Sequence, residues 1–379
     1  MAPLYVVQPS ANRGEGIFAQ EDLKPGTIIM TDRVTCEIKK DVPDIDEMDV
    51  AKAFQKLNPA DQELFMGLHE SHRPLKTKLF RIYKANAFQG EHSSHIFLKI
   101  SKFNHSCVPN CEVENSGTLA RKVIATTLIK KGEEIFISYH GAFEGYTKAQ
   151  RRVVTKTYFG FECDCSACTL GPEEQYLSDW RRKLIFVLQW RLKGLNPPDL
   201  RPLEALATMT AEEAEAKKVR QGWRAWPMER ALTEQEKTAY WSLQASLLEA
   251  EGLIGLMAPG SCYAQAFFLL VGQASKSKVM LRPTLDLAQC WKLRALDLLA
   301  SVNCGARSGE FAEWEKTLQD LWRKTGMQRS VQMFKTPLAK GTFAVQIREH
   351  QGIPVCEVFG EEEYKDKVRK GALPACMVS

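Results

Sequence analysis

The chain has 379 residues, of which 44% are hydrophobic and 26% charged, so it is long enough for two domains with separate cores. Its 51 basic and 46 acidic residues leave a net charge of only +5, and no cluster of five or more basic residues occurs, which argues against strong nucleic-acid binding. No apolar run approaches the roughly 20 residues of a membrane span. The eleven cysteines, an odd number, argue against a secreted disulfide framework. We therefore expect an intracellular protein, located in the cytoplasm, the nucleus or both.

The first half of the chain alternates between strand and helix patterns. Residues 4–40 are typical of strand, turn and strand, and residues 41–90 change to the pattern of three helices, the second with Asn58 as N-cap and Pro59 as its first residue. Strand character returns at 95–100 and again at 119–139. A further helix, capped by Thr147, leads into a cysteine-rich segment.

From about residue 173 onward the periodicity is helical. Six apolar residues at helical spacing predict one buried face: Tyr176, Trp180, Leu184, Val187, Leu188 and Leu192. Further helices are expected at 233–256, 260–275, 280–302 and 309–325. The sequence therefore predicts an α+β fold: a β-rich domain at 1–142 with a helical insertion at 41–90, a cysteine-rich segment at 143–172, and an all-α region at 173–379.

Three cysteines in six residues, Cys163, Cys165 and Cys168, form the strongest local signal. Zinc prefers four tetrahedral sulfur or nitrogen ligands, so this trio lacks one ligand. Cys107 is the first candidate for the fourth ligand because it lies in a polar, turn-like setting, and Cys111 is the second. Free thiols in a turn are the alternative. Packing alone explains such clustering poorly, and we expect a structural metal site.

Four separated motifs follow one another in a characteristic order. They are "NRGEGIFA" at 12–19, "SKFNHSCVPN" at 101–110, "GEEIFISY" at 132–139 and "FGFECDCSAC" at 159–168. In this order they resemble the SET-domain family of protein-lysine methyltransferases, which use S-adenosylmethionine. The most similar subgroup is the SET–MYND type, in which a TPR-like helical domain follows the SET region. The chain has no cysteine between 41 and 95, so the MYND zinc finger is absent.

The resemblance implies a role for each matching residue. Tyr139 would be the catalytic residue. The residues implied in S-adenosylmethionine binding are Arg13, Gly14, Gly16, Asn86, Ser101, Asn104, His105, Tyr139 and Phe161. Phe159 would line the channel for the substrate lysine. Zinc would be held by Cys107, Cys163, Cys165 and Cys168 of the post-SET segment.

One position departs from the family pattern. Phe159 stands where the family usually has a tyrosine, which implies looser control of the number of methyl groups added, or weaker activity. Two alternatives therefore stay open: a SET-like scaffold with vestigial activity, and a SET-fold enzyme acting on a small molecule. The expected partner is a protein or peptide lysine, with the helical region as a possible partner surface.

Overall fold

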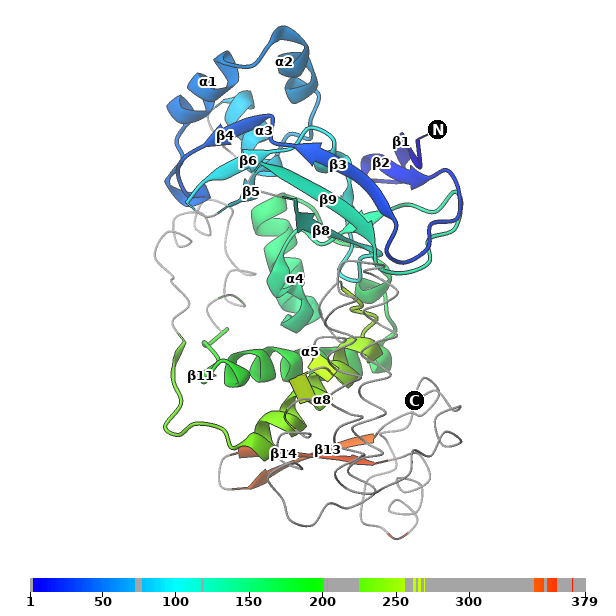
Figure 1. Ribbon diagram of the computed structural model, residues 1–379, viewed down its shortest axis with the longest axis vertical. Coiled ribbons are helices and arrows are strands. Elements are labelled where there is room, and N and C mark those ends of the chain that lie inside the picture. The colour runs from blue at the N-terminus through cyan, green and yellow to red at the C-terminus, as the bar shows by residue number, and fades with distance from the viewer. Residues whose placement is uncertain are drawn as a thin grey trace, which may run out of the picture.

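The β-rich and helical parts of the chain follow one another along the long axis of the molecule (Figure 1). This computed structural model describes residues 3–71, 77–90, 92–116, 119–200 and 225–255, single positions at 203, within 262–269 and at 370, and two strands at 344–350 and 353–359. The helices expected at 280–302 and 309–325, and most of the one at 260–275, lie outside the described residues.

Small sheets form the N-terminal part. The antiparallel strands of the first sheet are β1 (Tyr5–Ser10) and β2 (Gly14–Ala19). The second sheet has the order β3 (Ile28–Arg33), β9 (Ala120–Ala125) and β8 (Cys111–Asn115). The third has the order β4 (Cys36–Ile38), β6 (Ser94–Ile96) and β5 (Phe88–Gln89). The first two sheets share a core that includes Ile17, Phe97, Phe103 and Val123, whereas β4 and β6 contribute Cys36, Ile38 and Ile96 to a second core.

The expectation of a strand at 95–100 is wrong for the second half of that range. β6 ends at Ile96, and residues 100–102 form a 3₁₀ turn. The physical reason is the buried carboxylate of Asp32, which accepts hydrogen bonds from the main-chain nitrogens of Lys99 (2.8 Å) and Ile100 (3.1 Å). These bonds hold the chain in the turn that precedes the "NHSC" motif.

The motifs "SKFNHSCVPN" and "GEEIFISY" lie side by side where the chain crosses itself. β7 (Asn104–His105) pairs in parallel with β10 (Phe136–Ile137). The side-chain amide of Asn110 accepts a hydrogen bond from the nitrogen of Phe136 at 2.8 Å and donates one to the carbonyl of Glu134 at 3.0 Å. Asn110 therefore holds the "GEEIFISY" segment from both sides of residue 135.

The helical insertion agrees with the sequence pattern. It consists of α1 (Glu47–Gln55), α2 (Pro59–Met66) and α3 (Lys78–Asn86). The side chain of Asn58 caps α2 by accepting from the nitrogen of Asp61 at 3.0 Å. The insertion shares one core with the β4–β6–β5 sheet, on which it packs, as Figure 1 shows.

The cysteine-rich segment begins with α4 (Lys148–Val154), which Thr147 caps as expected. A π-helical turn (Thr155–Phe159) follows, and Gly160 ends it with a φ of +81°. Beyond it lie the long helices α5 (Pro172–Leu192) and α8 (Glu234–Ala250), which contact one another.

Two expectations for the C-terminal region are wrong. Tyr176 and Trp180 are exposed rather than buried, and the buried residues of α5 are Ser178, Arg182, Ile185, Phe186 and Leu188. The region is also not all-α. β13 (Ala344–His350) and β14 (Ile353–Phe359) form an antiparallel hairpin, and two short strands, β11 (Leu195–Asn196) and β12 (Trp226–Pro227), pair as well.

Candidate active site and metal centre

A cavity of about 1650 Å³ opens where the two crossing motifs meet the cysteine-rich segment. It exceeds the ~300–1,000 Å³ of a typical small-molecule pocket, so it has room for a cofactor and for part of a substrate. Of the residues that the sequence implicates in cofactor binding and in the channel, all but Gly16 line its wall: Arg13, Gly14, Asn86, Ser101, Asn104, His105, Tyr139, Phe159 and Phe161.

The glycine turn at the start of β2 packs against the side chain of Glu134. Gly14 has a φ of +75°, a conformation that favours glycine. A Cβ on Gly16 would lie 2.3 Å from a carboxylate oxygen of Glu134, so a larger residue there would have to displace that side chain. Glu134 in turn accepts hydrogen bonds from Ser10 (2.8 Å) and from the Asn104 amide (2.7 Å). The missing side chain of Gly16 therefore makes room for the Glu134 carboxylate and not for a ligand.

Arg13 lines the cavity together with Asp164. Its guanidinium pairs with Asp164, which lies between two cysteines of the trio, and sits 5.0 Å from the ring centre of Phe136. Asp164 was not predicted from the sequence, because nothing in the pattern "ECDCSAC" marks its aspartate as a partner of a residue 151 positions earlier. The pair ties the glycine turn to the cysteine-rich segment.

The polar residues of the cavity wall differ in whether their hydrogen-bonding groups are still available to bind a ligand. The Asn86 amide donates to the carbonyls of His69 (2.8 Å) and Ile82 (2.7 Å), and the Asn104 amide donates to the carbonyl of Glu15 (2.9 Å) as well as to Glu134. In contrast, the hydroxyl oxygen of Ser101 is buried and has no hydrogen-bond partner. A buried, unsatisfied hydroxyl on a cavity wall fits a site that receives a polar ligand.

Tyr139 lies at the end of the "GEEIFISY" motif with its hydroxyl already oriented. The hydroxyl donates to the carbonyl of Phe103 at 2.6 Å. Burial, with a smaller contribution from Glu134, raises the pKa of Tyr139 well above its usual value, so the phenol stays protonated. The oxygen can still accept hydrogen bonds from a ligand.

His105 joins Tyr139 to the cysteines. Its Nδ1 accepts from the main-chain nitrogen of Tyr139 at 3.2 Å, and its Nε2 lies 3.3 Å from the sulfur of Cys107. Burial lowers the pKa of His105 to about 4, so the ring is neutral near pH 7. With Nδ1 as acceptor, the proton sits on Nε2 and is directed at the sulfur.

An aromatic group closes this part of the cavity. The ring centre of Tyr139 lies 5.3 Å from that of Phe159 and 6.2 Å from that of Phe161. Both phenylalanines flank Gly160, whose left-handed conformation turns the chain after the π-helical turn. Apolar rings on this part of the cavity wall favour the exclusion of water from it.

The cysteine trio and Cys107 meet in space. One ligand atom from each of Cys107, Cys163, Cys165 and Cys168 lies within 4.8 Å of all the others. The Cys107 sulfur is 3.8 Å from that of Cys163 and 3.6 Å from that of Cys168. A tetrahedral zinc site with Zn–S bonds of about 2.3 Å separates its sulfurs by about 3.8 Å. The donor set therefore fits zinc in both chemistry and spacing.

Hydrogen bonds within the cluster divide its four thiols into two kinds. The main-chain nitrogen of Cys107 donates to the sulfur of Cys165 at 3.4 Å. Hydrogen bonds from Cys107 and Cys163 lower the pKa of Cys165 and of Cys168, whereas hydrogen bonds with the neighbouring cysteines and burial raise the pKa of Cys107 and of Cys163. Cys111, the second candidate for the fourth ligand, lies instead in the core of the small sheets.

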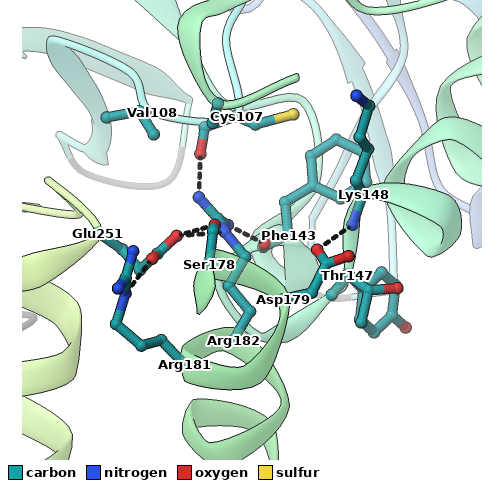
Figure 2. Close-up of polar contacts among 12 residues, drawn as sticks. Cys107, Val108, Phe143, Thr147, Lys148, Ser178, Asp179, Arg181, Arg182 and Glu251 are labelled. Atoms are coloured by element: carbon teal, nitrogen blue, oxygen red, sulfur yellow. Dashed lines mark hydrogen bonds and ion pairs between the residues drawn. The ribbon is translucent and has the colours of Figure 1, made fainter. Parts of the chain in front are cut away.

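A buried ion pair connects this centre to the C-terminal helices. Arg182 on α5 donates to the carbonyl of Cys107 (3.4 Å), to that of Phe143 (2.6 Å) and to the carboxylate of Glu251 (2.8 Å), as Figure 2 shows. Glu251, just after α8, also accepts from Ser178 at 2.6 Å and from Arg181 at 2.5 Å. The residues that follow it, 253–255, line the cavity.

The part of the chain that the structure describes contains no helix long and apolar enough to cross a membrane.

Comparison with known proteins gives one family and several relatives. Residues 14–140 match the family model described as SET domain. The histone-lysine N-methyltransferase set5 of Schizosaccharomyces pombe is 29% identical over 183 residues, which cover 48% of this chain and 55% of that protein. The N-lysine methyltransferase SMYD2 of Homo sapiens is 38% identical over 103 residues, covering 26% and 23%. A SET domain-containing protein of Dictyostelium discoideum is 40% identical over 76 residues, covering 20% and 18%. The matched regions thus span about half of the first relative and less than a quarter of the other two.

Proposed function

We propose that this chain, which carries a SET domain at residues 14–140, transfers a methyl group from S-adenosylmethionine to a lysine side chain of a protein. The observation that carries the proposal is the parallel pairing of β7 with β10, which puts Asn104, His105 and Tyr139 on the wall of one cavity with Phe159 and Phe161. The names of the relatives, histone-lysine and N-lysine methyltransferases, agree with a protein lysine as acceptor.

The cofactor would occupy the side of the cavity formed by the glycine turn and the "NHSC" segment. S-adenosylmethionine supplies a methyl carbon bonded to a positively charged sulfur. The unsatisfied hydroxyl of Ser101 offers it a hydrogen bond, and Arg13 offers a cation for its carboxylate. Phe161 would stack on its adenine ring, with Gly14, Asn86 and main-chain groups of β7 beside it.

In this scheme Tyr139 is an acceptor and not a base. Its proton is directed to the Phe103 carbonyl, and the raised pKa keeps that proton in place. The oxygen lone pairs can then align the substrate amine by a hydrogen bond, and can stabilise the transferring methyl group through C–H···O contacts. Positioning of this kind accounts for a large share of the rate in a bimolecular transfer.

The substrate amine has to be neutral to attack the methyl carbon. A free lysine has a pKa of about 10.4, and an apolar site lowers it by penalising the charged form. Phe159, Phe161 and the buried ring of His105, which is uncharged near pH 7, provide such a site. Because Phe159 has no hydroxyl, the amine has one polar partner fewer than a tyrosine would give.

The metal in this proposal is structural. Zinc bound by Cys107, Cys163, Cys165 and Cys168 would link the "NHSC" segment to the post-SET segment, and thereby hold Phe159 and Phe161 against Tyr139. We further propose the domain division 1–142, 143–172 and 173–379. The last part, with helices resembling a TPR-like domain, would contribute one wall of the cavity through residues 253–255.

The test uses the full chain loaded with zinc and S-adenosylmethionine carrying a deuterated methyl group. After incubation with a protein extract, mass spectrometry should find the label on lysine side chains, and Tyr139→Phe should slow the labelling about 100-fold or more. Cofactor binding with label only on small molecules would support the small-molecule alternative. Absence of cofactor binding would support the scaffold alternative. Either result would overturn the proposal.

A further inference from the structure

Two arginines beside the cysteine centre have no exposed surface: Arg151 on α4 and Arg182 on α5, each with a relative exposure of 0%. Burying a guanidinium is unfavourable unless an anion and hydrogen-bond acceptors replace the lost water, because this group does not give up its proton in proteins. Arg182 has such an anion in Glu251 (Figure 2). The two arginines differ in this respect.

Arg151 has no carboxylate partner among the described residues. It donates to the carbonyls of Tyr146 (2.7 Å) and Ala167 (3.0 Å), and its Nε has no hydrogen-bond partner. Its Nη2 also lies 3.7 Å from the sulfur of Cys168. The negative charge that compensates the buried guanidinium of Arg151 therefore has to come from the cysteine sulfurs.

The cysteines need a cation in the same way. Four thiolates around a divalent metal carry a net charge of −2, whereas four neutral thiols carry none. The surroundings are apolar, with Phe143, Val153 and Val154 packed in the same cluster, so this charge is poorly solvated.

We propose that Arg151 is the counter-ion of an anionic metal–tetrathiolate centre formed by Cys107, Cys163, Cys165 and Cys168. The inference rests on the metal site of the proposed function and adds to it a positioning residue outside the ligand set. By neutralising part of the charge, Arg151 strengthens retention of the metal, and its bond to Ala167 orients the loop that carries Cys165 and Cys168. Groups next to a metal centre commonly change its affinity in this way.

A purely structural role of Arg151, as a donor to two carbonyls, is the competing explanation. Two substitutions separate the roles. Arg151→Lys keeps the positive charge but loses the planar set of donors, and Arg151→Gln keeps an amide donor but loses the charge. Arg152→Gln is the matched control, because Arg152 is the next residue of α4 but is exposed and pairs with Glu162 at 2.7 Å.

The experiment measures the zinc affinity of the full-length variants by competition with a chromophoric chelator. We expect Arg151→Gln to bind zinc roughly 10- to 100-fold more weakly than the unmodified chain, Arg151→Lys to stay within a few-fold of it, and Arg152→Gln to be unchanged. Equal affinity of Arg151→Gln and the unmodified chain would overturn the counter-ion role, and so would equal losses in the Lys and Gln variants. If Arg151→Gln does not fold, the Lys variant decides: retained affinity supports the role, and a loss as large as that expected for Gln contradicts it.

A different result would overturn the metal site itself. If the unmodified chain binds no zinc, the site proposed above fails, whatever the variants do. The two failures are therefore distinguishable from the same set of titrations.

Discussion

The hydroxyl of Tyr139 donates to the main-chain carbonyl of Phe103 over 2.6 Å, and Phe103 directly precedes the strand that pairs with β10. The bond fixes the direction of the tyrosine proton before any ligand binds. It thereby leaves the oxygen as a preorganised acceptor at the point where the crossing motifs and the aromatic wall meet.

Replacing Tyr139 by phenylalanine should therefore impair methyl transfer much more than cofactor binding. Removing one preorganised polar contact at a reacting centre typically costs about 100-fold or more in kcat. We expect a loss of that order in single-turnover kinetics, with a dissociation constant for S-adenosylmethionine within a few-fold of the original. Tyr176→Phe, at an exposed tyrosine of α5, is the control and should leave both quantities unchanged. A Tyr139→Phe variant with full activity would rule out the role assigned to this hydroxyl.

Phe159→Tyr should change the distribution of methylated products. The Phe159 ring lies 5.3 Å from that of Tyr139, so the new hydroxyl would stand next to the existing one. An added hydrogen-bonding group holds the amine in one orientation and leaves less room for methyl groups already present. Mass spectrometry of a methylated protein should show a shift toward monomethyl-lysine. An unchanged distribution would mean that Phe159 does not border the lysine.

Much of the site could be predicted from sequence because short motifs carry it. The spacing of Cys163, Cys165 and Cys168 defines three ligands on one segment, and Cys107, the preferred fourth, lies with them in space. Asn110 lies in the motif "SKFNHSCVPN", but its role depends on a chain crossing that no local pattern describes. Periodicity cannot detect a contact between segments that meet only in the folded state.

The C-terminal helices show where periodicity fails. Apolar spacing along α5 selected a face that includes Tyr176 and Trp180, yet these are exposed while Ser178 and Arg182 are buried. The buried face includes these two polar residues because Arg182 binds the carbonyl of Phe143 and both residues bind the carboxylate of Glu251. A hydrophobicity pattern assigns a charged residue to the surface, so it cannot find a buried ion pair.

Asn110→Ala should destabilise the chain crossing. The substitution leaves the nitrogen of Phe136 and the carbonyl of Glu134 without their partner, and each unsatisfied group costs about 1–3 kcal/mol. We expect the free energy of unfolding in urea to fall by about 3 kcal/mol in total. Asn115→Ala, at the exposed end of β8, should change it by less than about 0.5 kcal/mol. Equal effects of the two substitutions would contradict this account of the crossing.

The two cysteines that competed as fourth ligand make a direct comparison. Cys107→Ala should lose the bound metal, because three sulfurs leave the tetrahedron incomplete. Cys111→Ala should keep the full metal content, since its side chain lies in the core of the small sheets. Elemental analysis of the purified variants measures both. Metal retained by Cys107→Ala but lost by Cys111→Ala would reverse the assignment.

The ion pair of Arg182 and Glu251 should be worth far more than an exposed pair of similar geometry. Glu251→Gln leaves a buried guanidinium without its counter-charge, and breaking such a pair costs about 3–5 kcal/mol. The exposed pair of Arg230 and Glu236, with an N–O distance of 2.6 Å, is the control, and Glu236→Gln should cost about 1 kcal/mol or less. Thermal unfolding of both variants gives the comparison. Similar losses would show that Glu251 is not the buried anion that α5 requires.

Calorimetric titration with S-adenosylmethionine, on the chain before and after metal removal, measures whether the thiolate centre supports cofactor binding. We expect one binding site per chain with the metal in place, and affinity at least 10-fold weaker without it, because the thiolate centre holds Phe159 and Phe161 at the cofactor. No detectable binding to the metal-loaded chain, or equal binding to both forms, would contradict this expectation.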